Sequence, residues 1–470
     1  MPISITVFKQ IPTETIYFWP CGSNNGFISL RSMEQTDIRS FDKTEVSRTT
    51  LIRPEKYLDL LSLTHPKMIA RGAGLSYCNA SVSKNGFSVD MSSFNRILDV
   101  NLERKNITVE AGMTIGDLNN FVIARGWIMP VLPGYPSITV GGCIAFNVHG
   151  KSQHNIGNFK AWVEEFTLFH PLHGEMTCSP HQNHALFELT VGGMGLTGII
   201  ISVTLKIKEL PGPGLEIKAV KATGFTEAVK IMHENANSFD YIYSWNDLNL
   251  KGASFGKGIV YLERYTKSVS GLNVLRYANR LKAKEKFYNL HSKASIRMMC
   301  LGYYCVESIK PSIKQIGIAN ASFPIYGKEI YYHFLGRRGF REYQVLFASS
   351  KWESAVEEIK KLIEDVKIAI TLGSLKIFKG DAHHISFAGE GICITIDIPN
   401  GEKGLSFFQG LDKIALKYSG TINLSKDSRA STQFVSALFP GYQRFKQQVN
   451  EFDLNHTFAS ELSQRIGISA

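Results

Sequence analysis

Residues 130–151 read P-V-L-P-G-Y-P-S-I-T-V-G-G-C-I-A-F-N-V-H-G-K, a stretch dominated by glycine, proline and small apolar residues. The glycines let backbone amides approach a flat or anionic ligand without interference from side chains, and the prolines stiffen the entry. The stretch ends in His149 and Lys151, two side chains that can titrate or donate hydrogen bonds. We interpret it as a cofactor-binding loop; a buried glycine-rich turn between two strands is the alternative.

Two further glycine-rich loops flank this stretch. Residues 71–79 read R-G-A-G-L-S-Y-C-N after an apolar strand predicted at 67–70, and residues 191–207 read V-G-G-M-G-L-T-G-I-I-I-S-V-T-L-K-I. A strand that ends in glycines and a serine leaves successive amides pointing into one concavity, which suits a pyrophosphate. The first loop lacks the G-x-G-x-x-G spacing and no helical pattern follows it, so a nicotinamide-type doubly wound site is poorly supported.

The length of 470 residues predicts two domains, and 44% hydrophobic with 20% charged residues is typical of a globular protein. The N-terminus lacks a charged segment followed by an apolar core, and no apolar run is long enough to span a bilayer. We therefore expect a cytoplasmic protein. Seven scattered cysteines without a C-x-x-C pair indicate reduced thiols and argue against a structural zinc site.

The formal net charge of +11 suits an anionic partner. Residues 267–314 concentrate lysines and arginines, interleaved with aromatic residues and methionines. Such a mixture can contact anionic lipid headgroups, which would make the protein peripheral at the inner face of a membrane, or line an entry for a lipid-linked phosphate. A solvated loop or helix face is the alternative. No RNA or DNA motif accompanies the charge, so nucleic acid is not an expected partner.

Regular elements are predicted around the loops. Residues 56–63 form a helix, 87–91 and 107–110 form strands, and T-I-G-D at 114–117 is a capping box that starts an amphipathic helix. Residues 163–169 and 175–178 form a hairpin. The histidines in and after its turn have no acidic ligand at a useful spacing, so they are expected to be surface residues and not a metal site: His170, His173, His181 and His184.

The sequence P-G-P-G at 211–214 predicts a domain boundary. Beyond it, strands and helices follow in the order β-α-β-β-α-β, which favours a mixed or antiparallel sheet with helices on one side. The clearest helix is 351–366, in which Trp352, Val356, Ile359 and Ile363 share one face. The tail at 427–470 is helical in pattern and too short to fold alone, so it should pack on the first domain.

The three loops, together with S-K-D-S-R at 425–429, stand in the order found in flavoproteins of the vanillyl-alcohol-oxidase (PCMH) type, which the chain resembles. Within that group the chain is most similar to the decaprenylphosphoryl-β-D-ribose 2'-oxidase family, the FAD-dependent half of an epimerase that makes lipid-linked arabinofuranose. The likeness extends from about residue 69 to the C-terminus.

The resemblance implies an α+β fold with a two-part FAD-binding domain, 1–210 and 425–470. A substrate-binding cap domain at 211–424 is inserted between the two parts and is built on a mostly antiparallel sheet flanked by helices. FAD is expected to be noncovalent, because Leu75 and Ser76 lie where covalent members often carry a histidine.

Carried over position by position, the resemblance also implies three sets of site residues. The catalytic set is Lys426, His149 and Lys151. The FAD contacts are Arg71, Gly72, Ala73, Gly74, Leu75, Ser76, Tyr77, Gly134, Thr139, Gly141, Gly142, Asn147, Val148, Ile199 and Asn423. The substrate contacts are Trp245, Tyr332, Gln344, Lys379 and Cys393.

Four positions depart from the family pattern. Asn423 replaces a tyrosine that contacts the cofactor, Thr395 falls where the family has a pocket cysteine, and Cys393 replaces an asparagine. Glu342 replaces a glutamine. The polar face of the pocket therefore differs, and the sugar can differ with it.

The implied function is oxidation of a secondary hydroxyl of a polyprenyl-phosphate-linked pentose. An NAD(P)H-dependent short-chain reductase partner would complete an epimerisation in cell-envelope polysaccharide biosynthesis. An aldonolactone or other free-sugar oxidase is one alternative, and a non-catalytic flavin-binding scaffold at the membrane is another.

In the implied chemistry Lys426 lies near the flavin pyrimidine edge and the sugar hydroxyl, and His149 is a candidate base. Two structural alternatives stay open at this point. Lys426 could instead pair with Asp427, and His149 could simply support its loop.

Overall fold

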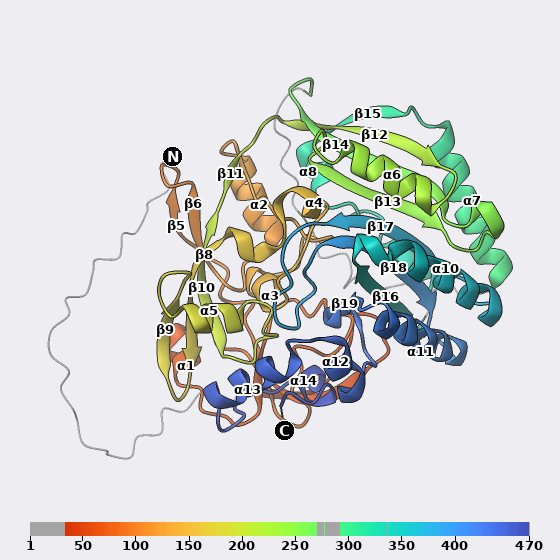
Figure 1. Cartoon of the computed structure of the whole chain (residues 1–470). Coiled ribbons are helices and arrows are strands. Elements are labelled where there is room, and N and C mark those ends of the chain that lie inside the picture. The colour runs from red at the N-terminus through yellow and green to blue at the C-terminus, as the bar shows by residue number, and fades with distance from the viewer. Residues whose placement is uncertain (1–32, 270–276, 278–291, 336, 470) are drawn as a thin grey trace, which may run out of the picture.

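The structure is a computed structural model that describes residues 33–269, 277, 292–335 and 337–469 (Figure 1). Two small sheets lie beside the glycine-rich loops. One has the order β1-β2-β4-β3, with β4 parallel to both neighbours, and the other is antiparallel with the order β5-β6-β10-β8-β9. Their strands are β1 (Met33–Arg39), β2 (Val46–Ile52), β3 (Met68–Arg71), β4 (Phe87–Asp90), β5 (Ile97–Asn101), β6 (Asn106–Glu110), β8 (Val163–His170), β9 (Gly174–Cys178) and β10 (Ile199–Lys206).

Local sequence signals in this part are confirmed. Helix α2 (Ile115–Ile123) begins at Thr114, whose side chain accepts a hydrogen bond from the Asp117 amide. Strands β8 and β9 form the predicted hairpin, with His170 opposite Gly174. The expectation that His170 lies at the surface is wrong: its side chain is fully buried, with Nε2 at 3.5 Å from Asp453 Oδ1, because the tail packs over the hairpin. A short pair, β7 (Trp127–Ile128) with β11 (Lys208–Glu209), closes this part of the chain.

The central glycine-rich stretch contains a helix that the sequence interpretation as a loop or turn did not include. Helix α3 (Val140–Ala145) begins at Thr139, whose side chain accepts a hydrogen bond from the Gly142 amide. Its Gly141 lies against Ala111, and a β-carbon built there would be 3.1 Å from the Ala111 β-carbon. Glycine is therefore used for close packing of a helix, a role that local sequence does not distinguish from a turn.

An antiparallel sheet of eight strands fills the second half of the chain, in the order β15-β12-β14-β13-β17-β18-β16-β19 (Figure 1). The predicted mostly antiparallel sheet is confirmed, with two strands, β14 and β15, that the sequence analysis did not recognise. The strands are β12 (Gly214–Ala222), β13 (Tyr241–Asp247), β14 (Lys257–Thr266), β15 (Ile313–Gly317), β16 (Phe340–Phe347), β17 (Leu372–Phe378), β18 (Gly391–Pro399) and β19 (Thr421–Ile422).

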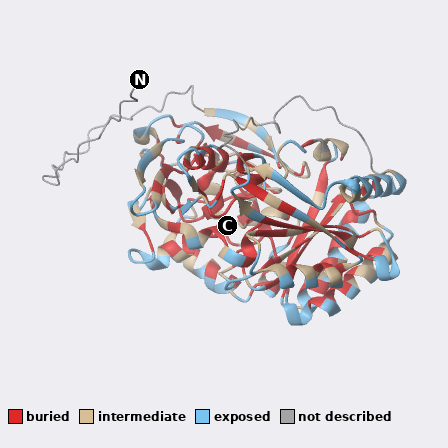
Figure 2. Ribbon diagram, turned by 90° about the horizontal axis from the view of Figure 1, so that it is seen from above, coloured by how far each residue is buried: buried red, intermediate tan, exposed pale blue. Residues whose placement is uncertain are grey.

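Three helices, α6 (Phe225–Asn235), α10 (Ser349–Val366) and α11 (Glu402–Lys417), pack on one face of this sheet. The predicted face of α10 is confirmed, since Trp352, Val356, Ile359 and Ile363 are buried. In Figure 2 the strands of the large sheet are mostly buried, while the outer surfaces of the helices are exposed. The other helices of the described chain, before the tail, are α1 (Tyr57–Leu61), α4 (Gln153–Ile156), α5 (His184–Thr190), α7 (Lys293–Ile309), α8 (Ile318–Ser322) and α9 (Ile330–Phe334).

Side chains alternate between the two faces of a strand, and here the faces differ in chemistry. The face toward the helices is apolar and contributes to the main core. The opposite face carries polar and aromatic residues at every second position: Tyr243 and Trp245, Tyr261 and Glu263, Glu342 and Gln344, Ser374 and Lys376, Thr395 and Asp397.

The C-terminal tail forms α12 (Thr432–Leu438), α13 (Tyr442–Phe452) and α14 (Glu461–Arg465) and contacts the first part of the chain. The Met68 amide donates to the Thr457 carbonyl at 2.7 Å, and the Ala459 amide donates to the Met68 carbonyl at 3.0 Å. Phe458 is buried in a cluster that includes Ile52 and Val89. Among the helices of the described residues, none combines the length and apolarity needed to cross a membrane.

Phe458→Ala should destabilise the protein by about 3–5 kcal/mol, because it leaves a cavity between the tail and the first sheet. Urea unfolding followed by circular dichroism measures the change. Leu454→Ala is the control, since Leu454 is 76% exposed, and it should change stability by less than about 0.5 kcal/mol. Equal stability of the two variants would contradict the packing of the tail described above.

Candidate active site

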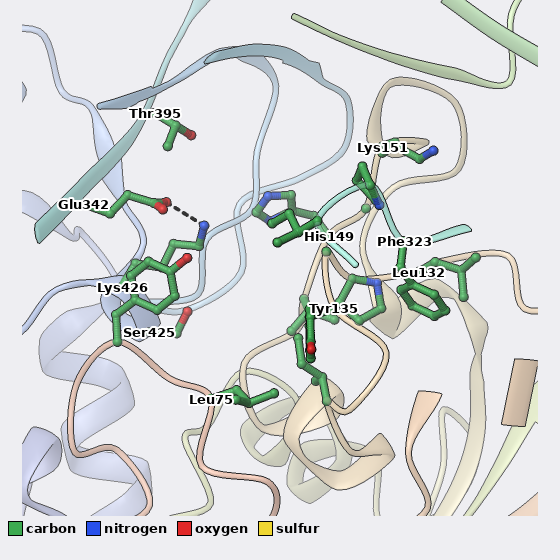
Figure 3. Close-up of a pocket in the computed structure, with 18 of the residues that line it drawn as sticks. Leu75, Leu132, Tyr135, His149, Lys151, Phe323, Glu342, Thr395, Ser425 and Lys426 are labelled. Atoms are coloured by element: carbon green, nitrogen blue, oxygen red, sulfur yellow. Dashed lines mark hydrogen bonds and ion pairs between the residues drawn. The ribbon is translucent and has the colours of Figure 1, made fainter. Parts of the chain in front are cut away.

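A cavity of about 1000 Å³ lies between the glycine-rich loops and the polar face of the large sheet. Figure 3 shows Lys426 and Glu342 on one side of it, Lys151 and Phe323 on the other, and His149 between them. The structure thus brings together residues from both halves of the chain. The predicted site residues that line the cavity are Gly72, Ala73, Gly74, Leu75, Ser76, Tyr77, Gly134, Thr139, Gly141, Gly142, Val148, His149, Lys151, Trp245, Tyr332, Gln344, Asn423 and Lys426.

Three predicted FAD contacts lie behind the lining instead of in it. The Arg71 guanidinium donates to Ser81 at 2.9 Å and lies directly under Gly74. Asn147 is buried and accepts a hydrogen bond from the Lys160 amide through its side chain. Ile199 is fully buried in the core under the first sheet. In this structure all three support the loops that face the cavity.

Two predicted substrate contacts also lie outside the lining. Lys379 follows the end of β17 and is exposed, with its amide directed at Gln153. Cys393 is on the cavity side of β18, but Leu346, Phe378 and Phe387 cover it. Thr395, two residues further along the same strand, lines the cavity in its place.

The loop after β3 has the properties of an anion-binding nest. Within the described chain, the amides of Gly72 to Ser76 have no hydrogen-bond acceptor, and all five residues line the cavity. Gly74 adopts a φ of +66°, which glycine tolerates at low cost. A β-carbon at Gly72 would lie 2.2 Å from the Thr139 hydroxyl, so the two loops approach as closely as backbone allows. A run of amides without acceptors beside a cavity fits a pyrophosphate.

The first loop is joined to the late S-K-D-S-R segment. The Tyr77 amide donates to the Ser425 carbonyl at 2.8 Å, and the Cys78 thiol lies 3.4 Å from the Leu424 carbonyl. The Lys426 ammonium lies 5.1 Å from the centre of the Tyr77 ring. These contacts bring Lys426 to the cavity wall.

Lys426 pairs with Glu342, and not with the adjacent Asp427 as one sequence alternative had it. Its Nζ donates to Glu342 Oε1 at 2.5 Å, and the side chains are 27% and 3% exposed. Asp427 instead pairs with Arg429 and Arg465. Burial, and then the charge of Glu342, raise the pKa of Asp397 well above its usual range. The raised pKa favours the protonated form of Asp397 next to the Glu342–Lys426 ion pair.

Amides and hydroxyls extend this polar surface. Asn423 donates to Gln344 Oε1 at 2.7 Å, and Gln344 donates to the Thr395 hydroxyl at 2.9 Å. Asn423 also accepts from the Ser425 amide through its side chain. These residues bring several donors and acceptors to one wall of the cavity, which suits a polyhydroxylated ligand.

Lys376 is a cavity residue that the sequence analysis missed. Burial lowers its pKa to about 8, and the charge of Lys426 acts in the same direction. Among the described residues its ammonium has no hydrogen-bond or ion-pair partner. The signal was present in the strand L-G-S-L-K-I-F, where Leu375 and Ile377 face the core and Lys376 must face the other way.

The remaining candidate catalytic residues differ in their surroundings. The His149 ring packs beside Phe378 and Phe387, with ring centroids 4.9 and 5.5 Å away, and burial lowers its pKa well below its usual range. The lowered pKa favours the neutral imidazole and makes it a weak base. Lys151 donates to Glu263 Oε2 at 2.6 Å and to the Ala321 carbonyl at 2.9 Å. Lys151 is thus bound by β14 and α8.

Comparison with known proteins agrees with this geometry. Residues 58–179 match the FAD binding domain family. The chain is 26% identical to the decaprenylphosphoryl-beta-D-ribose oxidase of Mycolicibacterium smegmatis, over 85% of this chain and 89% of that protein. It is 28% identical to the L-gulonolactone oxidase of Scyliorhinus torazame, over 34% of this chain and 36% of that protein. It is 32% identical to the L-gulonolactone oxidase of Mus musculus, over 26% of this chain and 28% of that protein.

The loops, the free amides and the matched domain define a flavoprotein that binds FAD. More particularly, the chain is an FAD-dependent oxidoreductase with a mixed α+β fold, and its residues 58–179 form the FAD-binding domain. The predicted resemblance to FAD-linked oxidoreductases, the fold class and the cofactor are confirmed.

Lys376→Met should stabilise the flavin-free protein at pH 7, on the order of 1–3 kcal/mol, by removing a buried amine. The pKa of Lys376 is lowered in the folded state, so the folded amine binds its proton less tightly than the unfolded one. The Lys376 amine therefore destabilises the folded protein fully below pH 8. This destabilisation disappears as the pH rises toward about 10.4, the pKa of lysine in the unfolded chain.

Urea unfolding at pH 7 and pH 10 measures the effect. The stability difference between variant and wild type should shrink at pH 10. Lys230→Met is the control, because Lys230 is 72% exposed and its substitution should have a small effect at both pH values. If Lys376→Met were more stable than wild type by the same free energy at both pH values, the lowered pKa of Lys376 would be contradicted.

Proposed function

We propose that the protein oxidises a secondary hydroxyl of a sugar to a ketone, and that the sugar is a polyprenyl-phosphate-linked pentose. The observation that carries the proposal is the row of hydrogen-bonding groups from Lys426 through Glu342, Gln344 and Thr395, in the same cavity as the FAD loops. The similarity to decaprenylphosphoryl-beta-D-ribose oxidase over most of both chains supports the substrate class.

We propose that different parts of the chain bind the cofactor and the substrate. Residues 1–210 and 425–470 bind FAD, and residues 211–424 form the substrate-binding cap. The amides of Gly72 to Ser76 hold the pyrophosphate, and noncovalent binding is favoured by the apolar Leu75 in that loop. The polar face of the large sheet supplies the groups that orient the sugar.

Oxidation of a secondary alcohol removes a proton from oxygen and a hydride from carbon, and bound FAD supplies the two-electron acceptor. The chain must orient the alcohol and receive the proton. Lys426 donates a hydrogen bond to the alcohol oxygen and so stabilises negative charge on it, and the Glu342 carboxylate, which lines the same cavity and is paired with Lys426, receives the hydroxyl proton directly. The protonated Asp397 lowers the repulsion that a second buried carboxylate would otherwise impose on Glu342.

The two other candidate catalytic residues take supporting roles in this proposal. His149, a neutral imidazole packed against Phe378 and Phe387, can exchange hydrogen bonds with the ligand at the centre of the cavity. Lys151 binds Glu263 of β14 and the Ala321 carbonyl of α8, and so positions the cap over the cavity. An NAD(P)H-dependent short-chain reductase would then reduce the ketone and complete an epimerisation in cell-envelope polysaccharide biosynthesis.

Lys426→Ala should retain the yellow FAD and lose turnover by about 10²-fold or more, because it removes the donor beside Glu342. Flavin absorbance and steady-state turnover measure the two effects. Lys417→Ala is the matched control: it breaks another lysine–glutamate pair, with Glu358, at an exposed position. Wild-type turnover in Lys426→Ala would remove the assignment.

Anaerobic bleaching of the flavin identifies the substrate class. A polyprenyl-phosphate-linked pentose should bleach the absorbance, whereas L-gulono-1,4-lactone should not, because a lactone lacks the phosphate and lipid. Bleaching by the lactone alone would establish the free-sugar alternative, and no bleaching by any sugar would establish a non-catalytic flavin protein. Acid precipitation of the same sample should release the flavin to the supernatant, as noncovalent binding requires.

A further inference from the structure

Helix α7 and the strand that follows it carry an unusual concentration of exposed apolar side chains. Fifteen large hydrophobic residues are exposed in the described part of the chain, and six of them lie between residues 298 and 313. The most exposed are Met298 at 72%, Leu301 at 62% and Ile309 at 83%. The helix lies at the right-hand edge of the molecule in Figures 1 and 2, where it is mostly exposed.

These residues form one face of the helix. Met298, Leu301, Cys305 and Ile309 recur at intervals of three and four, so their side chains lie in a single stripe. All four are exposed, whereas Ile296 and Cys300 on the opposite face are buried. An apolar stripe on the outside of a helix is the reverse of the usual surface pattern and marks an interaction surface. We call this stripe the α7 apolar face.

The inner face of the same helix lines the active-site cavity. Met299, Cys300, Tyr303 and Glu307 all contribute to the lining. A single helix therefore separates the cavity from whatever contacts the α7 apolar face.

Positive charge borders the α7 apolar face at both ends. At its start, Lys293 and Arg297 are exposed, and the charges of Lys403, Lys367 and Lys251 are close enough to act on Lys293. At its end, the exposed Lys310, Lys314 and Lys328 are part of the cavity lining, and Lys310 pairs with Glu307. The α7 apolar face thus lies between two cationic clusters. This arrangement is complementary to a surface with anionic groups on the outside and an apolar layer beneath them.

We propose that the α7 apolar face docks on an anionic lipid bilayer, so that the cavity wall that contains Lys310, Lys314 and Lys328 lies at the headgroup level. A second copy of this chain fits less well, because a symmetric contact would bring the cationic clusters of both copies together. The choice of a lipid surface rests in part on the proposed function, in which a lipid-borne sugar phosphate must leave the bilayer to reach the cavity.

The test measures binding of the FAD-loaded protein to vesicles by sedimentation. Wild type should bind vesicles that contain phosphatidylglycerol, bind vesicles of phosphatidylcholine alone at least about tenfold less, and lose binding as salt rises. Leu301→Glu and Ile309→Glu should each weaken binding by about tenfold or more. Leu454→Glu is the matched control, since Leu454 is 76% exposed on the tail, and it should bind as wild type does.

A second pair of variants tests the charge. Arg297→Glu should weaken binding to the anionic vesicles, whereas Lys351→Glu, an exposed change at the start of α10, should not. Retained flavin absorbance in every variant shows that the fold is intact. Unchanged binding in the α7 variants, no binding by wild type, or a dimer dispersed by Leu301→Glu in size-exclusion chromatography would each overturn the proposal.

Vesicle binding needs no turnover, so the two proposals fail in different ways. Loss of docking with intact bleaching by a lipid-linked pentose overturns only the docking surface. Docking without bleaching by any sugar overturns only the proposed function.

Discussion

The alternation of side chains along the eight-stranded sheet is the constraint on which the rest of the structure depends. Because neighbouring residues of a strand point to opposite faces, one set packs on α6, α10 and α11 and the other set faces the cavity. Ile394 and Ile396 are core residues, while Thr395 between them lines the cavity. The same strands thus supply core residues at one set of positions and cavity residues at the other set.

The second requirement is that the two ends of the chain meet. The tail returns to β3 through Met68 and Phe458, and the segment before it contacts the first glycine-rich loop through Tyr77 and Ser425. Asp427 is buried, and burial alone would raise its pKa, but Arg429 and Arg465 hold it below the usual value. The ion pairs of Asp427 with Arg429 and Arg465 hold the segment that carries Lys426 in place.

Two lysines of the cavity are paired with buried carboxylates. Lys426 and Lys151 are each compensated by a carboxylate, Glu342 and Glu263 respectively, at opposite sides of the lining. Lys376 has no such partner among the described residues. Its lowered pKa reflects the free-energy cost of holding a charged ammonium away from water without a partner. A buried, unpaired amine is seldom retained for stability, so its place in an oxidoreductase cavity indicates a role toward the ligand.

From the sequence by itself the local features followed: the glycine-rich loops, the cap of α2 at Thr114, the buried face of α10 and the resemblance that named the cofactor. Each depends on residues within one turn, one strand or one loop. Only the tertiary structure decided which side chains converge. Lys426 meets Glu342 across 84 positions, and Lys376 lines the cavity where Lys379 does not. Such convergence depends on strand register and on the return of the tail, which are set by packing between distant segments and leave no local pattern.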